Sequence, residues 1–303
     1  MPHGPLPVDE RNPIIIENDS FSDNWMGEYA VLLANSGGST LAGIIICSSE
    51  YWPDLNANVT GWNKFVNAAR ASGLKDIPDV TASAGERLHE PSDGQIDSTI
   101  PNRSAGAQRI IELSRELSLP WRPVVVLVGT QLTDLADAYL VDPSVVDRVV
   151  VVAALGTFDT PRALMTGPNG DLDPWADWIV AHRFKYIQVS AYYDQTADVT
   201  DTGIGNLPQN PLGDWIAAKQ PNISSLREAA DQVTVLVANV PQFATASTRM
   251  APDPSATFGS PIGQGPPLVP NQNGNAIVVT QVASPLAASR LWQMLLEPQL
   301  QQP

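Results

Sequence analysis

Cysteine, positive charge and long apolar runs are all scarce in this sequence, and each shortage excludes a class of protein. The 303 residues include one cysteine, Cys47, so no internal disulfide can form. Cys47 ends the apolar run 42–47, where a small core residue is expected rather than a thiol nucleophile. No stretch approaches the roughly 18 apolar residues of a membrane-spanning helix, and the first residues lack the order of a signal peptide. We therefore expect a cytoplasmic protein with no membrane partner.

The shortage of positive charge bears on the partners of the protein. Lys and Arg number 17 against 32 Asp and Glu, which gives a formal net charge of -15. Such a chain repels phosphate backbones and anionic lipid headgroups, so neither nucleic-acid polymers nor membrane surfaces are expected partners. The excess of acid is typical of a solvated surface, and it is also compatible with a bound divalent cation.

Short β-branched apolar runs are plentiful, and they alternate with helical patterns along the chain. Apolar residues make up 43% of the sequence, which is enough for a sizeable core. We predict strands at 13–16, 41–47, 123–128, 149–155 and 186–189. We predict helices at 24–35, 62–72, 103–117, 132–141 and 175–182. This alternation predicts an α/β fold, with a mostly parallel central sheet and helices on both faces.

The chain contains no internal repeat and no clean linker, so residues 1–303 are predicted to form a single domain. Residues 1–12 are expected to be a flexible tail. The segment 248–275 is rich in Pro, Gly, Asn and Ser and is predicted to be a long loop excursion. A strand at 276–282 and a helix at 285–296 then close a decorated C-terminal half.

An acidic loop follows the first predicted strand. Asp19, Asp23 and Asn24 lie just past the carboxyl end of that strand, where ligands gather in open parallel sheets. Carboxylate and amide oxygens are the ligands that Ca²⁺ prefers. The structural alternative is that Ser22 or Asp23 caps the next helix and that Asp19 forms a turn.

Four segments resemble the nucleoside hydrolases. Residues 17–24, ENDSFSDN, resemble the Asp-x-Asp-Pro-Gly-x-Asp-Asp signature that follows the first strand of that family. The others follow in the family's order: VLVGTQLTDLA from residue 126, NGDLDPWA from residue 169 and DQVTVLVANVPQF from residue 231. The resemblance spans about residues 12–297 and implies a nucleoside-hydrolase-like fold. It also implies a helix near residue 231, although the β-branched residues 233–240 alone favour a strand.

The resemblance implies a calcium centre. The metal ligands would be Asp19, Asn24, the backbone carbonyl of Gly129 and Asp231. In such a centre the cation binds water and the ribose diol together and lowers the pKa of the water. Asp19 would then take the proton of the metal-bound water as this water attacks the sugar.

The resemblance also implies contacts to the two parts of a nucleoside. Asp23 and Asn169 would bind the ribose. Trp52, just past the second predicted strand, is the candidate to stack on a purine base, and His89, on a predicted loop, is the histidine that could reach the departing base. The other tryptophans considered are Trp25, Trp175 and Trp178. A tryptophan at helical spacing is more often a packing residue.

Three positions depart from the family pattern and leave two functions open. Asn24 replaces a calcium-binding aspartate, Gly167 a ribose-binding acid, and Ala230 a histidine that protonates the leaving group. The first prediction is calcium-dependent hydrolysis of the N-glycosidic bond of a ribonucleoside or related N-riboside. The alternative is a non-catalytic ribose- or metal-binding protein on the same fold. By resemblance, a homo-oligomer (dimer or tetramer) is expected.

Two other enzyme classes lack their motifs. A dinucleotide-binding oxidoreductase needs Gly-x-Gly-x-x-Gly after the first strand, where this chain has DSFSDN at residues 19–24. A serine hydrolase of the α/β type needs a Gly-x-Ser-x-Gly elbow, which the sequence does not contain.

Overall fold

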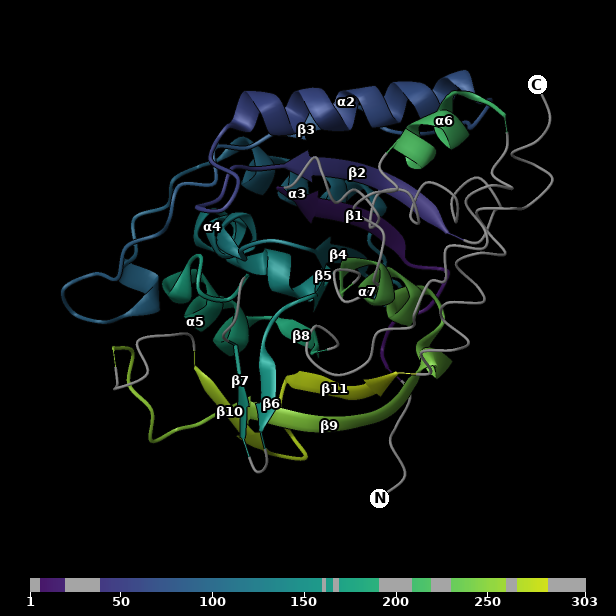
Figure 1. Ribbon diagram of the computed structural model, residues 1–303. Helices are drawn as coiled ribbons and strands as arrows, with labels where there is room; N and C mark the ends of the chain where they lie inside the picture. Colours follow the sequence, from purple (N-terminus) through teal and green to yellow (C-terminus); the bar gives the residue numbers. More distant parts are fainter. Residues whose placement is uncertain are drawn as a thin grey trace.

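The structure is a computed structural model that describes residues 6–19, 39–159, 162–165, 169–190, 209–218, 230–259 and 266–282. Within these ranges, eleven strands form one sheet in the order β3-β2-β1-β4-β5-β8-β11-β9-β10-β7-β6 (Figure 1). The α/β class, with a mostly parallel sheet, is confirmed.

Parallel strands make up the centre of the sheet. They are β3 (Val80–Ala82), β2 (Thr40–Ile46), β1 (Pro13–Asn18), β4 (Val124–Val128), β5 (Val149–Ala153), β8 (Lys185–Val189) and β11 (Ala276–Val282). Every residue of β4 and β5 is buried, since helices cover both faces. Burial on both faces is why these strands read as continuous β-branched runs rather than as alternating patterns. The six strands predicted from such runs are confirmed.

Antiparallel strands extend the sheet beyond β11. They are β9 (Ala244–Pro252), β10 (Pro267–Pro270), β7 (Arg162–Leu164) and β6 (Thr157–Asp159). The prediction of a loop excursion at 248–275 is wrong for the residues of β9 and β10. Met250 and Leu268 are fully buried in these strands, so ladder pairing and burial outweigh the loop-like composition.

Helices cover both faces of the sheet. Buried side chains of α2 (Leu55–Ala71), α6 (Pro211–Ala218) and α7 (Ala230–Asn239) pack with Ile14 and Ile16 of β1. Ile15 points the other way and packs with α3 (Ala105–Leu117), α4 (Thr133–Val141) and α5 (Pro174–Arg183). Short 3-10 helices are η1 (Ile96–Ser98), η2 (Pro143–Asp147) and η6 (Pro241–Phe243). Figure 1 shows α2 beside α6, and α4 beside α5.

Two helices differ from what local sequence patterns favour. Helix α2 begins at Leu55 rather than near residue 62, because the Asp54 side chain caps it by accepting from the N–H of Ala57 at 3.0 Å. Helix α7 is helical despite its β-branched residues, as the family resemblance implied. Val235 and Val237 are fully buried against the sheet, and this packing outweighs intrinsic propensity. The helices predicted at 24–35 and 285–296 lie outside the described residues.

The N-terminal segment is part of the core where the structure describes it. Leu6 and Val8 are buried, and Asn12 donates from Nδ2 to the Pro123 carbonyl at 2.8 Å. The prediction of a flexible tail is therefore wrong for residues 6–12. Across the described residues, no helix combines the length and apolar character needed to cross a membrane.

Candidate active site

The ends of β1, β4 and β5 lie next to one another at one edge of the sheet. Asp19 follows β1 directly. Gly129 follows β4, and its N–H donates to the Glu17 carbonyl at 2.9 Å, which fixes it beside the end of β1. Asn169 reaches the end of β5, where its Nδ2 donates to the Ala154 carbonyl at 2.8 Å. The structure thus brings Asp19, Gly129 and Asn169 to three adjacent strand ends, the position at which open parallel sheets bind ligands.

Asp19 lies in an acidic environment. Its side chain is nearly buried, and its N–H donates to Oδ1 of Asn18 at 2.7 Å. The same environment acts on Cys47, whose pKa is raised well above its ordinary value by burial and then by the charges of Glu17 and Asp19. Cys47 is therefore a neutral core thiol, as predicted. A cation at this edge would be favoured by the neighbouring carboxyl groups.

The described residues hold part of the predicted calcium ligand set. Asp23, Asn24, Trp25 and Gly167 lie outside them, as do the side chains of Ala230 and Asp231 at the start of α7. In the part of the chain that the structure describes, no three His, Cys, Asp or Glu side chains form a metal-binding group. The Asp19 carboxylate and the Gly129 carbonyl remain, and these hard oxygen donors on adjacent strands fit Ca²⁺ chemically.

Trp52 lies on a folded-back loop after β2. The backbone N–H of Trp52 donates to Oγ of Ser49 at 3.1 Å, and its backbone carbonyl accepts from Nδ2 of Asn58 at 3.0 Å. Asn58 is buried and also donates to the Cys47 carbonyl at 3.1 Å, so the loop is tied to the end of β2. The half-buried Trp52 therefore lies on the loop that follows β2, the strand that pairs with β1.

His89 and the remaining tryptophans occupy different surroundings. His89 is exposed, and the neighbouring Leu88 is anchored through its N–H to Oδ2 of Asp173 at 3.0 Å. Trp175 is buried, donates to Oγ1 of Thr99 at 3.0 Å and packs edge-on against Phe258. Trp178 lies 4.6 Å, ring centre to ring centre, from His182. Trp175 and Trp178 are thus packing residues of α5, as their helical spacing indicated.

A pair of buried carboxyl groups lies behind the strand ends, and the sequence reasoning did not identify it. Glu17 of β1 is fully buried, and neither of its oxygens has a hydrogen-bond partner among the described residues. Its neighbour Asp134 of α4 accepts from Ser83 Oγ at 2.9 Å and Ser104 Oγ at 2.7 Å, through Oδ1 alone. Burial, and then Asp134, raises the pKa of Glu17 well above its ordinary value. The signal in the sequence is an acid at the end of an otherwise apolar strand.

The electrostatics of this pair follow from its geometry. Oδ2 of Asp134 has no donor within the described ranges, so the two groups can be hydrogen-bonded only through a shared proton. Burial raises the pKa of Asp134 to about 6, even though the two serine hydroxyls favour its ionised form. One of the two groups is therefore protonated at neutral pH.

A second buried acid pair lies at the start of α5, where Asp173 is the N-cap residue and Asp177 lies in the first turns. Asp173 joins three segments: it accepts from Leu88 N–H at 3.0 Å, Thr133 Oγ1 at 2.7 Å and Ala176 N–H at 3.0 Å. Asp177, one turn later, is fully buried, and neither oxygen has a hydrogen-bond partner in the described part of the chain. Burial, and then the charge of Asp173, raises its pKa well above the ordinary value. The spacing of four residues on one helix was the available signal.

Comparisons with known proteins define the fold. No family model and no curated protein matches the sequence. The chain has the nucleoside hydrolase fold, as the four sequence segments implied.

Three solved structures illustrate this likeness. An inosine-guanosine nucleoside hydrolase is 18% identical, with a TM-score of 0.67 over 94% of this chain and 98% of that chain. An inosine-uridine preferring nucleoside hydrolase from Bacillus anthracis is 15% identical, with a TM-score of 0.66 over 94% of this chain and 99% of that chain. The type III effector protein XopQ, complexed with adenosine diphosphate ribose, is 14% identical, with a TM-score of 0.57 over 97% of this chain and 96% of that chain.

Proposed function

We propose that this protein hydrolyses the N-glycosidic bond of a ribonucleoside or a related N-riboside. The main observation in support is the position of Asp19, a nearly buried carboxyl group at the end of β1 beside Gly129. Support also comes from the fold, which is shared with nucleoside hydrolases that cover almost the whole chain. The ligand class is a small neutral riboside, which suits a chain of net charge -15 better than a polyanion.

The proposed chemistry assigns a role to each polar side chain at the strand ends. Cleavage passes through an oxocarbenium-like sugar, so the site needs an activated water and groups that hold the ribose hydroxyls. Asp19 is the general base that takes the proton of the attacking water. Asn169 is oriented by its hydrogen bond to the Ala154 carbonyl, and its Oδ1 would accept from a ribose hydroxyl. Asp23 is proposed to bind a second hydroxyl.

We propose that the site uses Ca²⁺. Its ligands would be Asp19, Asn24, the Gly129 carbonyl and Asp231, all of which supply oxygen. When bound, Ca²⁺ would lower the pKa of a water molecule and orient it toward the sugar. Because Asn24 is neutral, it contributes less to cation affinity than an aspartate would.

The base of the riboside is proposed to contact Trp52 and His89. Trp52 follows β2, which pairs with the strand that leads to Asp19, and a purine could stack on its ring. His89 is exposed on the loop that Asp173 anchors, so its imidazole could approach the departing base. Ala230 has no proton to donate, which leaves this step to another group.

A non-catalytic riboside-binding protein is the second candidate function. One observation favours it: a protein of the same fold, XopQ, was solved as a complex with adenosine diphosphate ribose. The substitutions at Asn24, Gly167 and Ala230 would lower turnover while leaving a ribose pocket in place.

The release of free base from a panel of purine and pyrimidine nucleosides separates the two functions. The panel is assayed with added Ca²⁺ and with chelator, on the wild type, on Asp19→Asn and on Asp214→Asn, an exposed acid of α6 that serves as a matched control. Calcium-dependent turnover that Asp19→Asn abolishes and Asp214→Asn retains is the expected result. No turnover, together with calorimetric binding of ribose or adenosine diphosphate ribose, would instead establish the binding function.

A further inference from the structure

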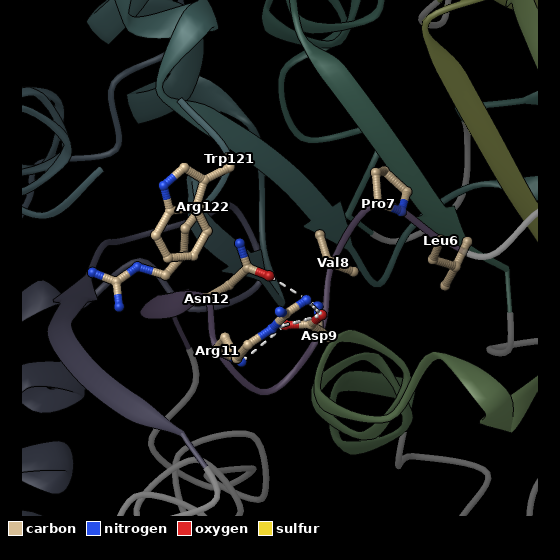
Figure 2. Close-up of a pocket in the computed structure, with 8 residues that line it drawn as sticks. All are labelled: Leu6, Pro7, Val8, Asp9, Arg11, Asn12, Trp121 and Arg122. Atoms are coloured by element: carbon tan, nitrogen blue, oxygen red, sulfur yellow. Dashed lines mark hydrogen bonds and ion pairs between the residues drawn. The ribbon is translucent and has the colours of Figure 1, made fainter. Parts of the chain in front are cut away.

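A small hollow lies where β1 and β4 begin, at the opposite end of these strands from Asp19. It has a volume of about 230 Å³, below the range of about 300–1,000 Å³ that accepts drug-sized ligands. Its lining residues are Leu6, Pro7, Val8, Asp9, Arg11, Asn12, Trp121 and Arg122 (Figure 2). Because β1 spans Pro13–Asn18 at about 3.3 Å per residue, the hollow is separate from the candidate active site.

The walls of the hollow are fixed by hydrogen bonds. Leu119 and Arg122 exchange two backbone hydrogen bonds of 2.9 Å each, which close a tight turn and present Trp121 with 69% of its surface exposed. On the facing wall, Oδ1 of Asn12 accepts from the N–H of Asp9 at 2.8 Å. The Nδ2 of the same asparagine donates to the Pro123 carbonyl and so joins the two walls.

The two arginines of the hollow differ in how their charges are balanced. Arg11 is paired with Asp9, with its Nε 3.0 Å from Oδ1 and 3.1 Å from Oδ2, so its charge is neutralised within the wall. Arg122 has no carboxylate partner among the described residues. Its guanidinium carbon lies 5.6 Å from the centre of the Trp121 ring. Figure 2 shows this guanidinium extending away from the Asp9–Arg11 pair.

The Nε of Arg122 is a buried donor without an acceptor. It has no hydrogen-bond partner within the described ranges, and it is shielded from solvent. A buried donor without a partner is unfavourable, and more so when the group is charged. Because Nε itself is shielded, an incoming oxyanion would meet the terminal N–H groups of the same guanidinium, and a planar carboxylate matches their geometry better than a point acceptor does.

We propose that this hollow binds a small organic carboxylate, held by Arg122 through its acid group and by Trp121 through its apolar part. An aryl or alkyl acid meets both requirements, because the largely exposed Trp121 lies beside the guanidinium. The ligand is small because the hollow is small. The chain's net charge of -15 opposes anions in general, so binding depends on the local charge of Arg122 and weakens as salt increases.

Saturation-transfer NMR with benzoate as the probe tests this assignment. Benzamide, which has the same shape without the charge, and inorganic phosphate, an oxyanion without an apolar part, are titrated in parallel. The proteins are the wild type, Arg122→Gln, Trp121→Ala and Arg109→Gln, the last a partly exposed arginine of α3 outside the hollow.

Saturable benzoate binding is expected in the wild type and in Arg109→Gln. Arg122→Gln should weaken it by at least tenfold, and Trp121→Ala, at an exposed site that leaves folding intact, should weaken it several-fold. The proposal is overturned if benzoate does not saturate, if benzamide binds equally well, if phosphate binds more tightly than benzoate, or if Trp121→Ala and Arg122→Gln both bind like the wild type.

Discussion

Glu17 of β1 and Asp134 of α4 are interacting buried carboxyl groups, and Glu17 precedes Asp19 by two residues in the chain. The pKa of Asp134 is about 6 in the folded state, above the ordinary value of 3.8. The folded state therefore keeps the Asp134 carboxyl protonated up to a higher pH than the unfolded state does. Protonation of Asp134 makes its full contribution to the free energy of unfolding below about pH 4, and this contribution is lost as the pH rises toward 6. A shift of two pKa units corresponds to about 3 kcal/mol at most.

Replacing Asp134 by asparagine should stabilise the protein at neutral pH. Asn Oδ1 can accept from Ser83 and Ser104 as Asp134 does, while the new amide N–H₂ donates toward Glu17. We expect the free energy of unfolding, measured in urea, to rise by about 1–3 kcal/mol at pH 7 and to change little at pH 4.

Asp137→Asn is the contrasting variant. Asp137 is buried too, but its oxygens accept from the backbone N–H groups of Arg103 at 3.1 Å and Ser104 at 2.7 Å. An amide group would there face a donor, so this variant should be destabilised at both pH values. Equal responses of the two variants would contradict the shared-proton interpretation.

Asp177→Asn should remove a second source of pH dependence. Because the pKa of buried Asp177 is raised, the wild type loses stability as the pH rises above the ordinary value of 3.8, by up to about 1.4 kcal/mol per pH unit. The variant should show a shallower decline in melting temperature between pH 5 and pH 8. Asp147→Asn, at an exposed position of η2, should leave the wild-type slope unchanged.

Asp19 and Asn169 should affect different kinetic constants if the proposed hydrolysis holds. Loss of a general base lowers kcat by about 10²–10⁴-fold, so Asp19→Asn should lower kcat by this factor when Ca²⁺ and nucleoside are both saturating. Asn169→Ala should raise KM by about tenfold, because it removes a contact to the ribose that is made in the ground state. Steady-state assays on the preferred nucleoside give both constants. A kcat effect of Asn169→Ala as large as that of Asp19→Asn would contradict these roles.

Gly156, in the loop after β5, has a close neighbour where a side chain would lie. Its φ is +86°, and an added Cβ would lie 2.3 Å from the Gln188 side chain, which is itself tied to Ser190 Oγ at 2.9 Å. Gly156→Ala should therefore lower the free energy of unfolding by about 2–5 kcal/mol. Gly73 has φ +90° but open space around it, so Gly73→Ala should cost only about 1–2 kcal/mol, the price of the backbone conformation. Urea titration of both variants separates the two effects.

Much of the fold was predictable because the central strands carry their own signal. The β-branched runs at β4 and β5 are buried on both faces, and no competing pattern overlaps them. Helix α7 could not be predicted from local propensity. Its valines favour a strand locally, but their packing against the sheet stabilises a helix. The antiparallel strands β9 and β10 were missed because pairing with distant residues, rather than composition, makes them strands.

The sequence predicted the position of a candidate site residue only where that residue directly follows a strand. Asp19 could be placed because it directly follows an apolar run, whereas Gly129 was identified through the family resemblance, and the structure puts both at strand ends. The two acid pairs could not be predicted, because the burial of Asp134 and Asp177 depends on how α3, α4 and α5 pack together. An acidic residue in a helix reads as solvated until the neighbouring helix is known.

The outermost strands of the described sheet, β3 and β6, have three residues each. A strand this short exposes few backbone N–H and C=O groups to a neighbouring molecule, whereas a long flat edge would offer a template for intermolecular pairing. The short ends of the described sheet therefore offer another molecule little backbone to pair with, although the centre of the same sheet is strongly apolar.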